Sequence, residues 1–220
     1  LEEEIEFILE TAGLYLNKVP TRKDVKSIFA GLRPLAAPQG DEKSTKEISR
    51  HHKVLISLSG LITLTGGKWT TYRKMAEDVM DKAIQVHDMP VKVSKTRNLS
   101  IHGNISVNVD YGINHLHIYG SDKKNIMTLQ SENPDNLEKL HNKYPFTVAE
   151  VIWSVKHEFA RTVEDALARR IRLLFLDARA AMEAAPLVAK IMAKELGKDN
   201  DWIKSQETEF INLAKNYILS

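Results

Sequence analysis

The chain has 220 residues, enough for one large domain or two small ones. Its 31 basic and 29 acidic residues nearly cancel, so no charge excess points to a nucleic-acid partner. The absence of cysteine excludes disulfides, thiolate zinc sites and a cysteine nucleophile, and favours a reducing cytoplasm. No apolar run reaches the roughly 18 residues that a membrane-spanning helix needs.

The N-terminal region predicts one helix and a small sheet. Residues 1–16, LEEEIEFILETAGLYL, have helical periodicity from the first residue, which indicates a piece of a longer protein. Residues 21–36, TRKDVKSIFAGLRPLA, predict a strand that ends at Pro34. Residues 48–67, ISRHHKVLISLSGLITLTGG, predict two antiparallel strands joined by a turn at Ser59 and Gly60.

The remainder of the chain is predicted to be mainly helical. Apolar residues recur at helical spacing from Thr70 to about Val86, residues 87–106 lack any periodicity, and residues 107–220 predict a helical bundle. Residues typical of helix boundaries stand at the expected places: Thr147 with Glu150, Thr162 with Asp165, and Gly197.

These patterns together predict an α+β fold. Its small antiparallel sheet with flanking helices occupies residues 1–86, a connector covers 87–106, and an all-α domain covers 107–220.

Several familiar motifs are absent. The sequence contains no G-x-G-x-x-G dinucleotide fingerprint and no P-loop, because Ile62 stands where the first P-loop glycine should be. Arg161 occupies the place of the second histidine of a zinc helix. The adjacent His51 and His52 point to opposite strand faces and have no carboxylate at ligand spacing, so we predict no metal site.

Cations gather around the glycine pair Gly66-Gly67, where the predicted second strand turns into a helix. A helix start exposes backbone N–H groups, which bind anions or electron-rich ring edges. Lys68 follows the pair, and Arg73 and Lys74 in the first helical turn indicate either an anion nearby or a solvated helix start.

Two arginines in the preceding segments extend this pattern. Arg33 and Arg50 share strand faces with apolar residues and should be largely buried, so each needs an anionic partner. Pairing with distant carboxylates is one explanation. A phosphate or carboxylate ligand held by Arg33, Arg50 and Lys68 is the other.

Three stretches of the sequence resemble one enzyme family. The C-terminal half of FAD-dependent glycerol-3-phosphate dehydrogenases, in the amino-acid-oxidase-like flavoprotein superfamily, is similar to the stretches GLRPL, EISRHHKV and LITLTGGKWTTYRKMAED. YPFTVAEVIWSVKHEFARTVEDALARRIRL resembles the terminal helical domain of the same family. The family oxidises sn-glycerol 3-phosphate to dihydroxyacetone phosphate, with electrons passing from the flavin to a quinone, or to oxygen in its oxidase members.

The resemblance implies that residues 1–86 are the C-terminal part of an FAD- and substrate-binding region, and it assigns roles to named residues. It implies that Gly66, Gly67, Lys68, Trp69 and Thr70 line the isoalloxazine ring of FAD near its pyrimidine edge. It also implies that Arg33, Arg50 and Lys68 bind glycerol 3-phosphate, with Arg33 and Lys68 taking part in catalysis. Which arginine holds the phosphate is left open by the sequence.

The resemblance further implies partners for the chain. These are the N-terminal FAD-binding domain that this sequence lacks, a second copy in a homodimer, and a peripheral contact with the inner membrane. Because the dinucleotide fingerprint is missing, we expect the chain alone to be inactive and not to retain FAD. Two alternatives remain: a fragment of an amino-acid-oxidase-like flavin enzyme, and a non-catalytic interaction module centred on residues 107–220.

Overall fold

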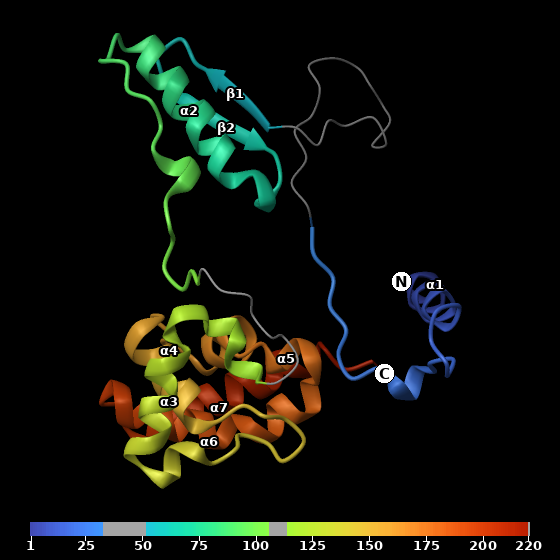
Figure 1. Ribbon diagram of the computed structural model, residues 1–220. Coiled ribbons are helices and arrows are strands. Elements are labelled where there is room, and N and C mark those ends of the chain that lie inside the picture. The colour runs from blue at the N-terminus through green and yellow to red at the C-terminus, as the bar shows by residue number, and fades with distance from the viewer. Residues whose placement is uncertain (33–51, 106–113, 220) are drawn as a thin grey trace. The chain divides into compact units, whose positions relative to one another are not determined.

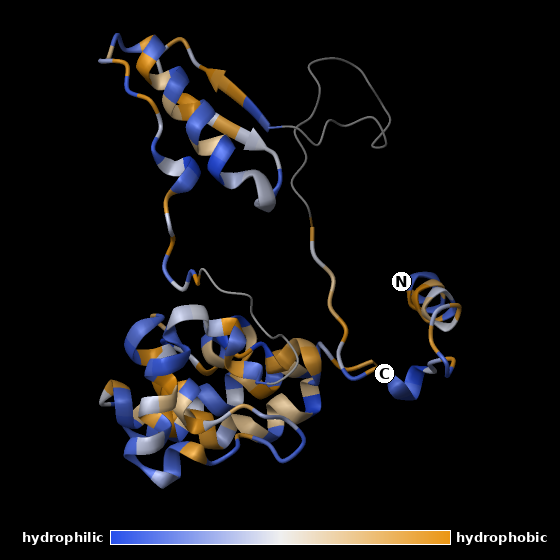
Figure 2. Cartoon of the chain, in the orientation of Figure 1, coloured by the Kyte–Doolittle hydropathy of each residue, from blue (hydrophilic) through white to orange (hydrophobic). Residues whose placement is uncertain are grey.

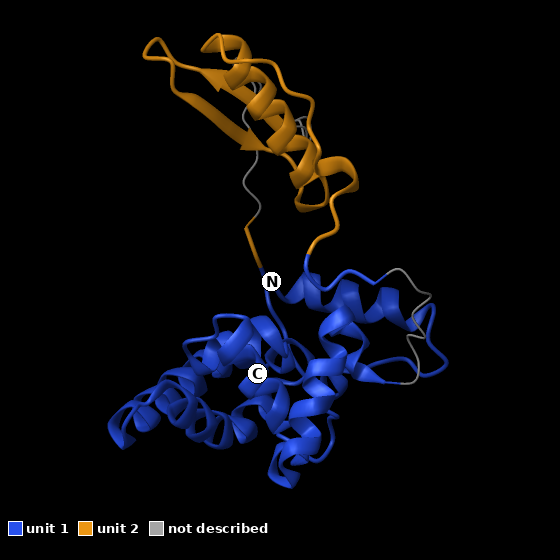
Figure 3. Cartoon of the chain, turned by 60° about the vertical axis from the view of Figure 1, so that its left-hand side comes forward, with its two compact units in different colours: residues 1–30, 102–220 blue, residues 31–101 orange. Residues whose placement is uncertain are grey.

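The computed structural model describes residues 1–32, 52–105 and 114–219. The chain divides into two compact units (Figure 3). We call residues 31–101 the hairpin unit, and residues 1–30 together with 102–220 the helical unit. The described residues combine a small antiparallel sheet with many helices, which confirms the predicted α+β class.

The hairpin unit is built from a strand pair and one long helix (Figure 1). β1 (His52–Ile56) pairs antiparallel with β2 (Ile62–Gly66), with His52 opposite Gly66. α2 (Tyr72–Val86) follows β2 after a short 3₁₀ turn, η2 (Trp69–Thr71), and contacts both strands. The predicted hairpin and the predicted helix up to Val86 are therefore confirmed.

Local chemistry explains the hairpin. β1 begins hydrophilic and becomes hydrophobic along its length (Figure 2), and its branched residues suit a half-buried strand. The turn closes where Ser57 N–H donates to the carbonyl of Leu61 at 3.0 Å. Gly60 has φ +83°, a conformation in which a side chain would be strained, so this position of the turn favours glycine.

The helical unit contains most of the buried apolar side chains. Its elements after residue 113 are η4 (His115–Asp122), α3 (Lys123–Glu132), η5 (Pro134–Leu137), α4 (Val148–His157), the π-helical η6 (Asp165–Arg170), α5 (Leu173–Leu176), α6 (Ala178–Leu196) and α7 (Asn200–Lys215). α6 packs against both α4 and α7. Its buried face is rich in alanine, for example Ala181, Ala184 and Ala185, and small side chains let neighbouring helices approach closely.

The predicted helix boundaries are confirmed. Thr147 caps α4, and its N–H donates to a carboxylate oxygen of Glu150 at 2.8 Å. Glu150 is fully buried and also accepts a hydrogen bond from the hydroxyl of Tyr119 at 3.1 Å, while His115 Nε2 lies 3.0 Å away. Burial, together with the nearby Glu150 carboxylate, raises the pKa of Tyr119 above its ordinary value. Gly197 ends α6 with φ +64°.

The predicted strand over residues 21–36 is wrong for the part that the structure describes. Residues 22–24 form a 3₁₀ turn, η1 (Arg22–Asp24), and no strand is assigned in residues 25–32. The backbone there bonds to the C-terminal part of the chain instead: Ile28 N–H donates to the carbonyl of Tyr217 at 2.8 Å, and Ala178 N–H donates to that of Lys26 at 3.1 Å. Alternation of side chains along a segment indicates an extended backbone, but it does not identify the segment to which that backbone is hydrogen-bonded.

The first 30 residues group with the C-terminal helices rather than with the sheet. The predicted helix is present as α1 (Glu2–Gly13), which has no buried side chain. Arg22 of η1 holds it through Glu2 and Glu6, at 2.8 and 3.0 Å. The assignment of residues 1–86 to an FAD and substrate region stays a prediction, and so does the boundary at residues 87–106.

Candidate cofactor-edge site

Two glycines with left-handed backbone conformation connect the end of β2 to the helical turns that lead into α2. Gly66 has φ +75° and Gly67 has φ +86°. A Cβ on Gly67 would lie 2.6 Å from Sδ and Cε of Met75, and 3.2 Å from Cβ of His52. Left-handed backbone costs an ordinary residue about 1–2 kcal/mol, so conformation and space both favour glycine at this turn.

Lys68 is the residue from which the helical turns begin. Its backbone is extended, with φ −135° and ψ 148°, and its carbonyl accepts hydrogen bonds from the N–H and the hydroxyl of Thr71, both at 3.0 Å. Its side chain is exposed, and no ion pair joins it to another described residue. The ammonium group can therefore meet an anion or an electron-rich ring edge.

A hollow of about 650 Å³ opens at this turn. Trp69, which is 88% exposed, lies beside it with its ring 5.9 Å from the ring of Tyr72. The residues that line the hollow are Gly66, Gly67, Lys68, Trp69, Thr70, Tyr72 and Met75. All five residues that the sequence predicts for the cofactor edge thus line one concave surface of apolar and cationic character.

The two predicted arginines lie outside the described residues. Arg33 and Arg50 fall within residues 33–51, so their convergence with Lys68 stays a prediction. Among the described residues, no cluster of histidines and carboxylates could hold a metal ion. For the rest of the chain, the absence of a metal site stays a prediction.

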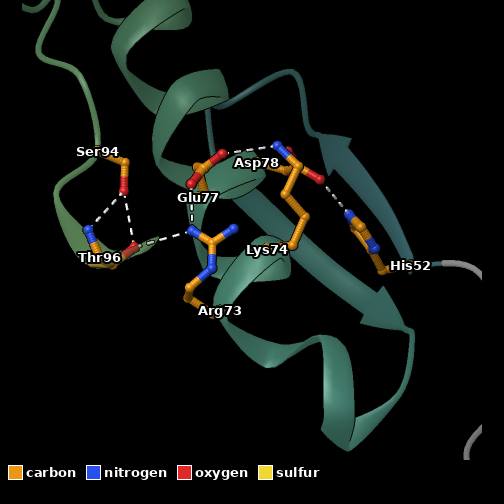
Figure 4. A network of polar contacts seen from close by, with 7 residues as sticks. All are labelled: His52, Arg73, Lys74, Glu77, Asp78, Ser94 and Thr96. Carbon is orange, nitrogen blue, oxygen red and sulfur yellow. Dashed lines mark hydrogen bonds and ion pairs between the residues drawn. The ribbon is translucent and has the colours of Figure 1, made fainter. Parts of the chain in front are cut away.

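Arg73 and Lys74, which could indicate either a bound anion or a solvated helix start, have carboxylate partners on their own helix. Arg73 pairs with Glu77, and Lys74 pairs with Glu77 at 2.9 Å and with Asp78 at 2.8 Å (Figure 4). These carboxylates lie three or four residues further along α2, where helix geometry brings side chains together. The charges at the start of α2 are thus balanced within the helix, and Lys68 remains as the cation that faces the hollow.

Sequence reasoning missed the role of His52. The sequence predicts only that His52 binds no metal, whereas the structure places His52 Nε2 at 2.8 Å from Asp78 Oδ2 on α2. The two residues are 26 positions apart on different kinds of element, and no sequence signal joins them. Only the fold of the hairpin unit brings them together.

We predict that Gly67→Ala destabilises the hairpin unit by about 1–2 kcal/mol, because the φ of +86° becomes strained even if the flexible end of Met75 moves aside. Hydrogen exchange of the β2 amides would measure this. Gly31→Ala is the matched control, since a Cβ there meets no atom within 4 Å. Equal effects of the two substitutions would contradict the prediction.

The ion pairs of α2 predict an acid-sensitive hairpin unit. Hydrogen bonds from Arg73 and then Lys74 lower the pKa of Glu77 from 4.5 to about 2. A carboxyl whose folded pKa is depressed stabilises the fold above its unfolded pKa, and this contribution is lost as the pH falls through the folded value. The contribution of Glu77 is therefore complete above about pH 4.5 and disappears towards pH 2.

The measurement is thermal unfolding of the chain and of Glu77→Gln across this pH window. We expect the variant to be less stable near neutral pH and the difference in Tm to shrink as the pH falls towards 2. Asp81→Asn removes an exposed carboxylate one turn further along α2 and serves as the control. A difference that stays constant with pH would show that Glu77 acts without its charge.

Comparison with known proteins places the chain in one family. Residues 61–202 match the family described as the C-terminal domain of alpha-glycerophosphate oxidase. The chain is 35% identical to a mitochondrial glycerol-3-phosphate dehydrogenase of Arabidopsis thaliana, over 99% of this chain and 38% of that protein. It is 37% identical to that of Bos taurus, over 99% of this chain and 32% of the relative.

The human mitochondrial glycerol-3-phosphate dehydrogenase is 38% identical, over 94% of this chain and 31% of the relative. The chain thus spans about a third of the length of these relatives. Within the described ranges, every helix is too short or too polar to cross a membrane. The match to residues 61–202 includes the glycine turn, α2 and most of the helical unit, and the chain belongs to the family of alpha-glycerophosphate oxidase C-terminal domains.

Proposed function

We propose that the chain is part of a flavoprotein that oxidises sn-glycerol 3-phosphate to dihydroxyacetone phosphate. The single observation that supports this most is the hollow at the β2–α2 junction, because all five predicted cofactor-edge residues line it. The relatives named above are glycerol-3-phosphate dehydrogenases, which favours this substrate over the amino acids of the alternative flavin enzymes.

The residues present fit one edge of a flavin ring. Gly66 and Gly67 line the hollow without side chains, and the first N–H groups of a helix start are in general available to an electron-rich partner. Lys68 adds a positive charge, and Trp69 adds an exposed aromatic wall. FAD, when bound, would supply the acceptor for the hydride that leaves the substrate carbon.

The chain's own contribution would be electrostatic and positional. Negative charge develops at the pyrimidine edge of a flavin when it accepts a hydride, and Lys68 and the turn's N–H groups would stabilise that charge. Because the turn is fixed before the reaction, these groups need little reorganisation. Arg33 and Arg50 would hold the phosphate and orient the reacting carbon, as the family resemblance implies.

The remaining parts of the proposal follow from the family. Electrons would pass to a quinone, with oxygen as the alternative acceptor. The described residues provide one wall of a flavin site, so we propose that the chain alone neither retains FAD nor turns over, and that an N-terminal FAD-binding domain completes it. A homodimer, a peripheral contact with the inner membrane and a cytoplasmic location stay predictions; the relatives' names place those proteins in mitochondria.

We expect Lys68→Met to lower kcat/KM for glycerol 3-phosphate by about a hundredfold or more in a polypeptide that joins this chain to its FAD-binding region. The reason is the loss of positive charge at the cofactor edge. Steady-state kinetics with an artificial electron acceptor would measure it. Lys92→Met, which removes an exposed lysine outside this hollow, should leave turnover unchanged. Near-normal turnover of Lys68→Met would remove the lysine from the site.

A further inference from the structure

His52 lies directly beneath the glycine turn. It is the first residue of β1, and its Cα is paired across the sheet with Gly66, the last residue of β2. A Cβ built on Gly67 would come within 3.2 Å of the Cβ of His52. The histidine therefore lies opposite Gly66 in the strand pair and close to Gly67.

The imidazole of His52 links the first residue of β1 to α2 through a hydrogen bond. Its Nε2 lies 2.8 Å from Asp78 Oδ2, and the other oxygen of Asp78 is 2.8 Å from the ammonium of Lys74 (Figure 4). The two bonded side chains are only 23% and 32% exposed. A hydrogen bond from Lys74 in the first place, and one from His52, lower the pKa of Asp78, so the acceptor stays charged near neutral pH.

The polar contacts of His52, Asp78 and Lys74 continue along α2 to the segment that follows the helix. Lys74 also pairs with Glu77, which pairs with Arg73, and Arg73 donates to the hydroxyl of Thr96 at 3.2 Å. Figure 4 shows these side chains lying in one row from His52 on β1, across α2, to Ser94 and Thr96 beyond the helix. His52 is thus the end of a chain of polar contacts that holds the strand pair, the helix and the following segment together.

Such a link matters because the described sheet has two strands. A two-stranded hairpin is marginally stable by itself, and its ends fray first. The glycine turn is located at one of these ends, between β2 and α2. Without a fixed distance between the first residue of β1 and α2, the N–H groups of the turn would not keep one direction.

We propose that His52 is a positioning residue for the cofactor edge: its bond to Asp78 fixes the Gly66–Lys68 turn relative to α2, so that the backbone N–H groups and Lys68 hold their places beside the flavin. This inference rests on the proposed function. His52 itself does not line the hollow, and it acts through the turn.

The test uses the flavin-loaded polypeptide with its FAD-binding region, and substitutions that separate the hydrogen bond from side-chain volume. His52→Leu removes the bond to Asp78, whereas His52→Gln keeps an N–H donor near the same place. We expect His52→Leu to alter the visible spectrum of the bound flavin and to lower kcat about tenfold with little change in KM, because His52 does not touch the substrate. His52→Gln should restore most of both.

Lys53→Leu is the matched control, because Lys53 is the next residue of β1 and points to the opposite face. It should leave spectrum and kcat at the wild-type values. A spectrum and kcat of His52→Leu equal to those of the wild type would overturn the inference. So would equal losses in His52→Leu and His52→Gln, which would indicate that only the ring's packing matters.

The outcome for Lys68→Met separates this inference from the proposed function. If Lys68→Met lowers turnover while His52→Leu does not, the cofactor-edge proposal stands and the positioning role fails. If neither substitution changes turnover or the spectrum, both the positioning role and the proposed function fail. Should His52→Leu not fold, Asp78→Asn is measured in its place, since it weakens the same bond from the helix side and is expected to change the spectrum and kcat in the same direction.

Discussion

The left-handed backbone of Gly66 and Gly67 is the constraint on which the rest of the site depends. Two consecutive residues with φ +75° and +86° reverse the direction of β2 and start the helical turns that lead into α2. Because Gly67 has no Cβ, the turn packs closely against Met75 and His52, and both glycines line the hollow. Lys68, Trp69 and Thr70 take their places from this turn.

The charges around the turn fall into two groups with different roles. Arg73 and Lys74 pair with Glu77 and Asp78 on their own helix, and these pairs stabilise α2. Lys68 has an extended backbone before the helix begins, out of reach of these i+3 and i+4 partners. The local fold thus pairs the cations of the helix with carboxylates, whereas Lys68 forms no ion pair with any residue that the structure describes.

Much of the fold could be predicted from the sequence because its signals are local. The alternation in residues 52–66, the turn residues Ser59 and Gly60, and the caps at Thr147 and Gly197 each specify structure within a few residues. The predicted strand before Arg33 failed because an extended segment can bond to a helical unit as well as to a sheet. The bond between His52 and Asp78 depends on tertiary structure, which no spacing in the sequence reveals.

The proposed cofactor site requires that the turn from Gly66 to Lys68 contacts the flavin. Hydrogen–deuterium exchange of the flavin-loaded polypeptide, compared with the same polypeptide after removal of the flavin, tests this directly at the backbone. We expect slower exchange of the amides of residues 66–70 when the flavin is bound, with little change in the helices α6 and α7. Equal exchange of residues 66–70 in both states, with protection confined to other segments, would contradict it.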